Sequence, residues 1–121
     1  MEKYKKINFK PPIGVRKAAK RGLELRKKFH RGGLSSKEAG KLHIGSGIVR
    51  AVNLTKGLRM APDTVRRMKN YFTRHRVDKR PGWANPSNPS NGYIAWLLWG
   101  GDHGFAWAKK IFRQMEAADK K

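Results

Sequence analysis

The 121-residue chain contains no cysteine. It can form neither a disulfide nor a thiolate zinc site, so its core must hold without such cross-links. This absence is compatible with an intracellular location. No apolar run approaches the ~20 residues that a membrane-spanning helix requires. The basic N-terminus is not followed by the apolar segment of a secretory signal.

Acidic residues are also scarce. Asp and Glu together number 8, whereas Lys and Arg number 29, which gives a formal net charge of +21. Such an excess repels itself in a compact domain, and a polyanion relieves the repulsion. Nucleic acid is the commonest partner of this kind, because its phosphates release condensed counterions when a basic protein binds. The composition therefore predicts a nucleic-acid-binding protein.

Basic residues are missing from one long segment. Residues 81–108 contain no Lys or Arg but hold all four tryptophans. By contrast, residues 1–31 contain twelve Lys or Arg and two Glu, and residues 61–80 contain seven Lys or Arg and two Asp. The chain thus separates basic surfaces from one aromatic core segment, which a disordered basic tail would lack.

The distribution of apolar residues predicts an all-α fold, because no segment alternates polar and apolar residues over strand length. We expect a compact bundle of about five helices in a single domain, residues 13–121, preceded by a basic arm, residues 1–12. Tyr4, Ile7 and Phe9 are expected to pin the arm to the domain. An alternative for the two aromatic residues is stacking on the bases of a single strand.

Helical spacing and capping residues predict where the helices lie. The expected helices span 13–29, 48–56, 62–76, 93–99 and 103–118, with a further short helix from Ser35 or Ser36 to Leu42. The residues expected in the core of the longer helices are Val15, Ala18, Ala19, Gly22, Leu25, Phe29, Val65, Met68, Phe72, Phe105, Ala108, Ile111, Phe112 and Met115. Gly57 is expected to end the helix before it and Asp102 to cap the last helix. Residues 77–92, rich in Pro, Asn and Ser, are expected to form a long loop.

The aromatic segment has two interpretations. Residues 93–99 are apolar on every side, as is typical of a central buried helix. Trp96 and Trp99 would then support the fold, whereas Trp83, in the loop, would be partly exposed. The alternative is that the tryptophans form an aromatic pocket or a surface for a partner.

The arm and two of the expected helices supply the candidate nucleic-acid-binding residues. Basic side chains on several sides of helix 13–29 are suited to phosphates, which fix position without reading sequence. Helix 62–76 would lie along a groove, where its polar side chains reach phosphates or base edges. The candidates are Lys5, Lys6, Arg16, Lys17, Lys20, Arg21, Lys27, Lys28, Arg66, Arg67, Lys69, Asn70, Arg74 and Arg76. The alternative is an ordinary solvated outer face on each helix.

Residues 57–68 resemble a helix-turn-helix motif. Gly57, Leu58, Thr64, Val65 and Arg67 match such motifs in residue type. The turn is about two residues too long, and an alanine occupies the position where a capping hydroxyl is expected. A sequence-reading regulator is therefore an alternative function.

The four histidines do not form a recognisable catalytic or metal-binding pattern. None of His30, His43, His75 and His103 is spaced at i, i+4 from another ligand, and no carboxylate cluster accompanies them. A nuclease usually needs carboxylates for a metal or a paired general acid and base. We therefore expect no catalytic residue, no metal and no cofactor.

Several strings together resemble a known family. They are Thr64-Val-Arg-Arg-Met, Tyr71-Phe-Thr-Arg-His, Asp78-Lys, Gly92-Tyr-Ile-Ala-Trp-Leu-Leu-Trp-Gly-Gly-Asp102, Trp107-Ala, Gly14-Val-Arg-Lys-Ala-Ala and Gly22-Leu-Glu-Leu-Arg. This pattern, which spans most of the chain, is similar to a small basic domain in proteins of tailed bacteriophages and other large DNA viruses. The resemblance implies a viral origin and a role near viral DNA, in the infected cell's cytoplasm or nucleoid or inside the virion. It implies no activity and assigns no role to a single residue.

These observations predict a protein that binds nucleic acid, with duplex DNA preferred, mainly through phosphates. It would compact, package or protect viral DNA. Three alternatives remain: the sequence-reading regulator, a virion structural protein that binds an acidic protein surface, and a small nuclease. Sequence does not separate DNA from RNA or a monomer from a dimer, and no membrane partner is expected.

Overall fold

Residues 2–29 and 47–120 are described by the computed structural model, and within them every regular element is a helix. The elements are η1 (Glu2–Tyr4), α1 (Ile13–Phe29), α3 (Gly47–Thr55), α4 (Pro62–His75), η2 (Arg76–Asp78), α5 (Asn91–Leu98) and α6 (Gly101–Asp119). The predicted all-α bundle of about five helices is confirmed. The helix expected from Ser35 or Ser36 to Leu42 lies outside the described residues.

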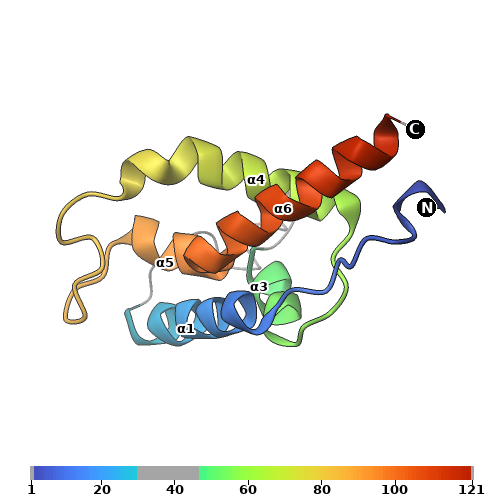
Figure 1. Cartoon of the computed structure of the whole chain (residues 1–121). Helices are drawn as coiled ribbons and strands as arrows, with labels where there is room; N and C mark the ends of the chain where they lie inside the picture. The colour runs from blue at the N-terminus through green and yellow to red at the C-terminus, as the bar shows by residue number, and fades with distance from the viewer. Residues whose placement is uncertain (1, 30–46, 121) are drawn as a thin grey trace, which may run out of the picture.

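The helices form three layers. α5 and α6 lie in the middle and pack against each other, α1 packs on one side of them, and α4 packs on the other side (Figure 1). α3 packs mainly against α1 and also contacts α5. The middle layer therefore separates α1 from α4.

Helix α1 begins and ends where its sequence pattern predicts. Its buried residues Val15, Ala19, Gly22 and Leu25 follow one another at three- or four-residue intervals and face the middle layer. At Gly22 the two helices approach closely, because an added Cβ would lie 2.8 Å from the backbone nitrogen of Leu98 in α5. A side chain larger than hydrogen at this position would force α1 and α5 apart.

The turn between α5 and α6 depends on glycine. Gly100 and Gly101 both have positive φ, 113° and 65°, a region that residues with a Cβ rarely adopt. Gly100 is also the N-cap of α6. The expectation that Asp102 caps this helix was therefore wrong, because the helix begins one residue before it. Asp102 lies in the first turn of α6 and is available for other contacts.

The loop before α5 is shorter than expected. α4 ends at His75, and the chain continues directly into η2. At the other end, the Ser90 hydroxyl accepts a hydrogen bond from the backbone N–H of Tyr93 at 3.1 Å, so α5 begins at Asn91. The predicted loop 77–92 therefore reduces to residues 79–90, and helix 93–99 is replaced by Asn91–Leu98.

Trp96 lies at the centre of an aromatic cluster. It is 2% exposed, and its ring centroid lies 4.7 Å from that of Phe72 in α4, 6.0 Å from that of Phe105 in α6 and 5.8 Å from that of Trp83 in the loop. Its indole N–H donates to a carboxylate oxygen of Asp102 at 2.9 Å. One side chain thus joins the middle layer to α4 and to the loop.

The burial pattern departs from expectation at several aromatic residues. Phe105 and Phe112 are only partly buried, as are Ala18 and Phe29. Tyr71 and Trp107, which were not expected in the core, are both 7% exposed. Tyr71 and Trp107 are buried because α4 and α6 each contact more than one helix, so that their buried faces are wider than a single stripe.

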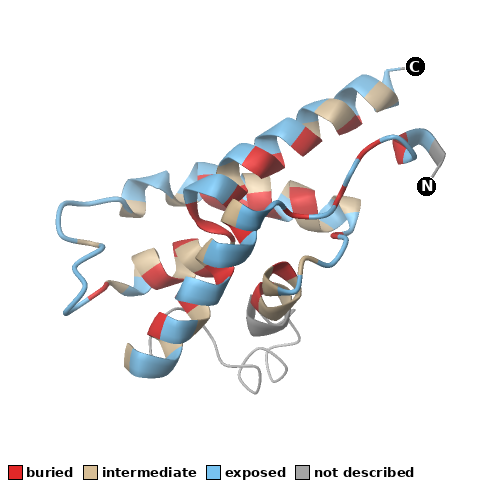
Figure 2. Ribbon diagram, turned by 60° about the horizontal axis from the view of Figure 1, so that its bottom comes forward, coloured by how far each residue is buried: buried red, intermediate tan, exposed pale blue. Residues whose placement is uncertain are grey.

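The N-terminal arm is part of the core. Tyr4, Ile7 and Phe9 are buried, as predicted, and they alternate with exposed polar residues along the chain (Figure 2). The Phe9 carbonyl accepts a hydrogen bond from the backbone N–H of Met60 at 2.9 Å. Residues 2–4 form the turn η1 rather than an extended segment.

Replacing the central tryptophan should unfold or severely destabilise the protein. Trp96→Ala removes a buried indole, which costs about 3–5 kcal/mol, a large part of the stability of a small domain. Trp83→Ala should cost much less, because Trp83 is only partly buried. Thermal unfolding followed by circular dichroism measures both changes. A folded Trp96→Ala protein with an unaltered melting temperature would contradict this assignment.

Acid should remove one specific contribution to stability. Burial favours a raised pKa for Asp102, but hydrogen bonds from Lys79 and Trp96 outweigh it and hold that pKa below its ordinary value of 3.8. A carboxylate with a depressed folded pKa contributes its full stability above the ordinary pKa and loses it as the pH falls through the folded value. Asp102→Asn should therefore lower the free energy of unfolding at pH 7 by about 0.5–1 kcal/mol, since the ion pair is exposed.

The measurement for this prediction is urea unfolding of both proteins between pH 7 and pH 2. The difference between them should shrink below pH 3.8 as the wild-type carboxylate is protonated. A difference that stays constant to pH 2 would show that the charge of Asp102 is irrelevant.

Candidate nucleic-acid interface

The outer side of α1 carries a basic face. It lies opposite the buried stripe of Val15, Ala19 and Gly22, because the two sets of residues are half a helical turn apart. This α1 face consists of Lys17, Lys20, Arg21, Lys27 and Lys28, all of them exposed. Glu24 is the one acidic residue among them. From first to last residue the face is about 16 Å long at 1.5 Å per residue.

Arg16 does not belong to this face. Its side-chain Nε donates a hydrogen bond to the carbonyl oxygen of Thr55 at 3.3 Å, at the end of α3. The same side chain lies against Gly57, where an added Cβ would come within 3.0 Å of it. Arg16 therefore ties α1 to the end of α3, and five of the six candidate residues in α1 remain as the outward-facing set.

A second basic face lies on the outer side of α4. Arg67, Asn70 and Arg74 are exposed and share one side of the helix, opposite the buried Val65 and Met68. The exposed Arg76 follows in η2. We refer to Arg67, Asn70, Arg74 and Arg76 as the α4 face.

Two candidate residues of α4 have structural partners instead. Arg66 forms an ion pair with Asp63 at 2.7 Å and donates to the Tyr4 hydroxyl at 3.0 Å. The Lys69 ammonium lies 4.5 Å from the ring centroid of Phe112 in α6. These two side chains hold the arm and α6 against α4, contacts that the sequence pattern did not predict.

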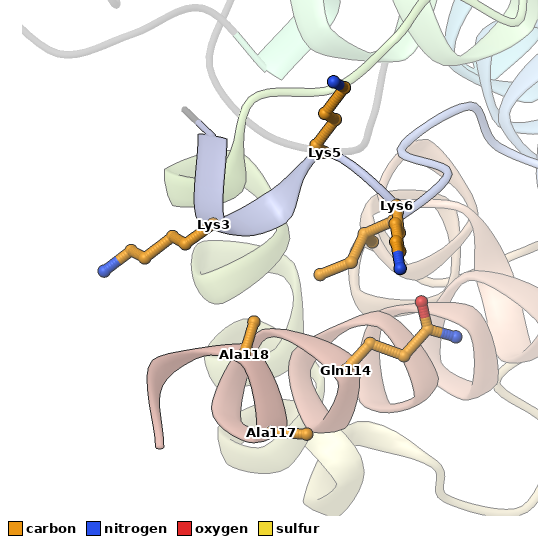
Figure 3. Close-up of a pocket in the computed structure, with 7 residues that line it drawn as sticks. Lys3, Lys5, Lys6, Gln114, Ala117 and Ala118 are labelled. Carbon is orange, nitrogen blue, oxygen red and sulfur yellow. The ribbon is translucent and has the colours of Figure 1, made fainter. Parts of the chain in front are cut away.

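The arm presents its lysines beside the end of α6. A groove of about 450 Å³ separates the two segments, and it is lined by Lys3, Lys5, Lys6, Ile7, Gln114, Ala117 and Ala118. Figure 3 shows Lys6 directed toward Gln114 and Lys5 pointing away from α6. Lys3 pairs with Asp119 at 3.0 Å, and hydrogen bonds from Tyr4 and Lys3 lower the pKa of that carboxyl. Lys5 and Lys6, both exposed, are therefore the lysines of this groove that are open to an anion.

One further cation, Arg50 of α3, has a structural role that sequence reasoning missed. Its guanidinium lies 3.3 Å from the ring centroid of Trp99, and Trp99 stacks on Tyr71 at 4.5 Å. Burial lowers the pKa of Arg50 to about 10, which still leaves it protonated at neutral pH. Burial also raises the pKa of Tyr71. The stack continues to His75, whose ring lies 4.5 Å from Tyr71 and whose Nδ1 is 2.9 Å from Asp78.

Sequence reasoning also missed cations on α6. Lys109, Lys110 and Arg113 are exposed on the outer side of this helix. Their three- and four-residue spacing is the signal that identified the other two faces, and it was present in the sequence. The Lys109 ammonium lies 4.4 Å from the ring centroid of Phe105, so this side chain also covers part of the core.

The two main basic faces point in opposite directions. The buried side of α1 faces α5 and α6 from below in Figure 1, and the buried side of α4 faces them from above. Because each basic face lies on the far side of its helix, the α1 face and the α4 face are on opposite surfaces of the molecule. The sequence-predicted residues of α1 and α4 therefore form two sites and not one.

The packing of α3 does not follow the helix-turn-helix arrangement. In that motif the first helix supports the second across a turn of three or four residues. Here residues 56–61 separate α3 from α4, and the extensive contacts of α3 are with α1. α4 packs instead on α6.

The described part of the chain contains no group of three or more His, Cys, Asp or Glu side chains positioned to hold a metal ion. None of its helices is long and apolar enough to cross a membrane. Comparison with known families, curated proteins and solved structures found no match to this chain. The likeness to viral proteins therefore stays a prediction from the sequence strings that suggested it.

Two neighbouring arginines, Arg66 and Arg67, should differ in how much they contribute to the stability of the fold. Arg66→Gln should lower the free energy of unfolding by about 1 kcal/mol, because the Tyr4 hydroxyl and Asp63 lose their partner. Arg67→Gln removes the same charge from an exposed position and should change it by less than about 0.5 kcal/mol. Urea unfolding of the two variants makes the comparison. Equal stability losses would show that Arg66 is an ordinary surface residue.

Proposed function

We propose that this protein binds duplex DNA through its phosphates and acts by compacting, packaging or protecting it. The observation that carries the proposal is the α1 face, on which five exposed cations lie along about 16 Å of one helix. Phosphates follow one another along a DNA strand at 3.4 Å of rise, so a straight basic face of this length meets several of them.

The use of the acidic residues supports the same function. All four aspartates have a basic partner within the chain, at the surface of the fold; the partners are Lys3, Arg66, His75 and Lys79. They are therefore not available to neutralise the outward-facing lysines and arginines. The net charge of +21 therefore leaves the surface of the protein strongly positive. Binding of a polyanion relieves the repulsion between these charges.

The binding is expected to be largely independent of DNA sequence. Contacts to phosphate oxygens position a protein without distinguishing bases. The cations are spread over two helices and the arm, and the helix that a helix-turn-helix protein would insert into the major groove is not supported by α3 as that motif requires. Viral DNA is the partner that the phage-like sequence strings favour, in the infected cell or inside the virion.

The dependence of affinity on salt tests this function. If the five cations of the α1 face each neutralise a phosphate, log affinity should fall against log salt with a slope of about −4.5. A fourfold rise, from 50 to 200 mM, should then weaken binding about 500-fold. Fluorescence anisotropy with a labelled duplex measures this, and single-stranded DNA and RNA of the same length serve as comparisons.

Two outcomes would change the conclusion. A slope close to zero would exclude phosphate binding and leave an acidic protein surface as the partner. One duplex sequence preferred about a thousandfold or more over others would replace the proposal with a sequence-reading regulator.

A further inference from the structure

We propose that a single molecule has two independent duplex-binding faces and bridges two DNA duplexes. This inference rests on the proposed function and adds to it an activity, cross-linking, that one binding face would not provide. The α1 face and the α4 face are the two contacts. The partner of each is a separate stretch of duplex DNA.

The fold directs the two faces away from each other. α1 buries Val15 and Ala19 toward the middle layer, and α4 buries Val65 and Phe72 toward the same layer from its other side. Figure 1 shows the middle helices between α1 and α4. Packed helices are 8–10 Å apart, so the axes of α1 and α4 are separated by about 16–20 Å across the middle layer.

One duplex cannot occupy both faces without wrapping around the molecule. Duplex DNA has a persistence length of about 50 nm, far greater than the thickness of this domain, and tight bending costs several kcal/mol. The α4 face has only four polar side chains, Arg67, Asn70, Arg74 and Arg76. Their contacts with phosphates are too few to offset the free energy of bending one duplex around the whole domain. A second duplex meets the α4 face with no bending at all.

Screening makes the two faces independent. The Debye length is about 8 Å at physiological ionic strength, which is less than the separation of the faces. A duplex bound to the α1 face therefore neither neutralises the α4 face nor strongly repels a duplex approaching it. The net positive charge between two bound duplexes also offsets their mutual repulsion.

The experiment measures binding and bridging separately. A biotinylated duplex of about 20 base pairs, far below the 150-base-pair persistence length, is immobilised on beads so that it cannot wrap. Protein is added at the concentration that saturates this duplex, followed by a fluorescent duplex of the same length. Fluorescence retained on the beads reports bridging, and anisotropy with the single duplex reports binding.

Three matched variants each remove three positive charges from exposed positions. The α1 variant is Lys17→Gln, Lys20→Gln and Lys27→Gln; the α4 variant is Arg67→Gln, Arg74→Gln and Arg76→Gln; the control is Lys109→Gln, Lys110→Gln and Arg113→Gln on α6. All three should keep a melting temperature close to that of the wild type, because they change exposed side chains, and among these only Lys109 covers part of the core, through its contact with Phe105. Analytical ultracentrifugation at the assay concentration establishes whether the protein is a monomer.

The wild-type protein and the α6 control should retain the fluorescent duplex. The α1 and α4 variants should each still bind one duplex but retain at least tenfold less of the second. Wild-type protein that binds the immobilised duplex but captures no second one would overturn bridging and leave the proposed function standing. Wild-type protein that binds no duplex would overturn both.

Two further results would also refute the inference. If the α6 control loses as much bridging as the other variants, bridging follows total charge and not two faces. If one variant loses binding and bridging together while the other loses neither, a single face is used, and any bridging comes from association of protein molecules.

Discussion

The packing of Trp96 is the interaction on which the rest of the structure depends. A cysteine-free chain of this size has only packing to hold its layers together, and this indole contacts aromatic residues from α4, α6 and the loop. Its N–H would be costly to bury without a partner, and the carboxylate of Asp102 supplies one. The same carboxylate accepts from Lys79 at 2.6 Å, which fixes the start of the loop against α6.

Arg50 extends this organisation to α3. A guanidinium that is largely removed from water needs compensation, and the face of Trp99 provides it through a cation–π contact at 3.3 Å. Trp99 in turn stacks on Tyr71, so α3, the end of α5 and α4 share one stack of planar groups. Arg50 is thus a largely buried cation that packs against the core, whereas most other cations of this protein face solvent.

Local patterns in the sequence were sufficient to predict most of the helices. α1 was predicted to the residue, because its apolar spacing is regular and a proline precedes it. The start of α5 was misplaced because Ser90 was assigned to the loop. Serine is a preferred N-cap residue, so the sequence did contain the information needed to place this start. The start of α6 was misplaced for a different reason. Aspartate is a common N-cap, so Asp102 was expected to precede the helix, but the N-cap is Gly100 in a left-handed conformation.

The candidate site was less predictable, because long-range contacts decide which cations are free. Arg66 and Arg67 are neighbours with the same chemistry, and spacing alone puts both outside the buried stripe. Only the return of the arm, which brings Tyr4 to a residue 62 positions away, removes Arg66 from the outer face. The opposition of the α1 and α4 faces likewise follows from the order of the layers, which no local pattern encodes.

The distribution of charge connects the fold to its function. Each of the four aspartates has a basic partner within the fold, and two of these pairs join residues distant in sequence, Lys3 with Asp119 and Lys79 with Asp102. Each such pair stabilises the fold only modestly, because it is exposed to solvent. The larger effect of these pairs is on the charge of the outer surface. The aspartates position the arm and the loop, and the α1 face and the α4 face stay positive. The folded protein therefore repels itself along α1 and α4, and contact with phosphates lowers its free energy on both sides.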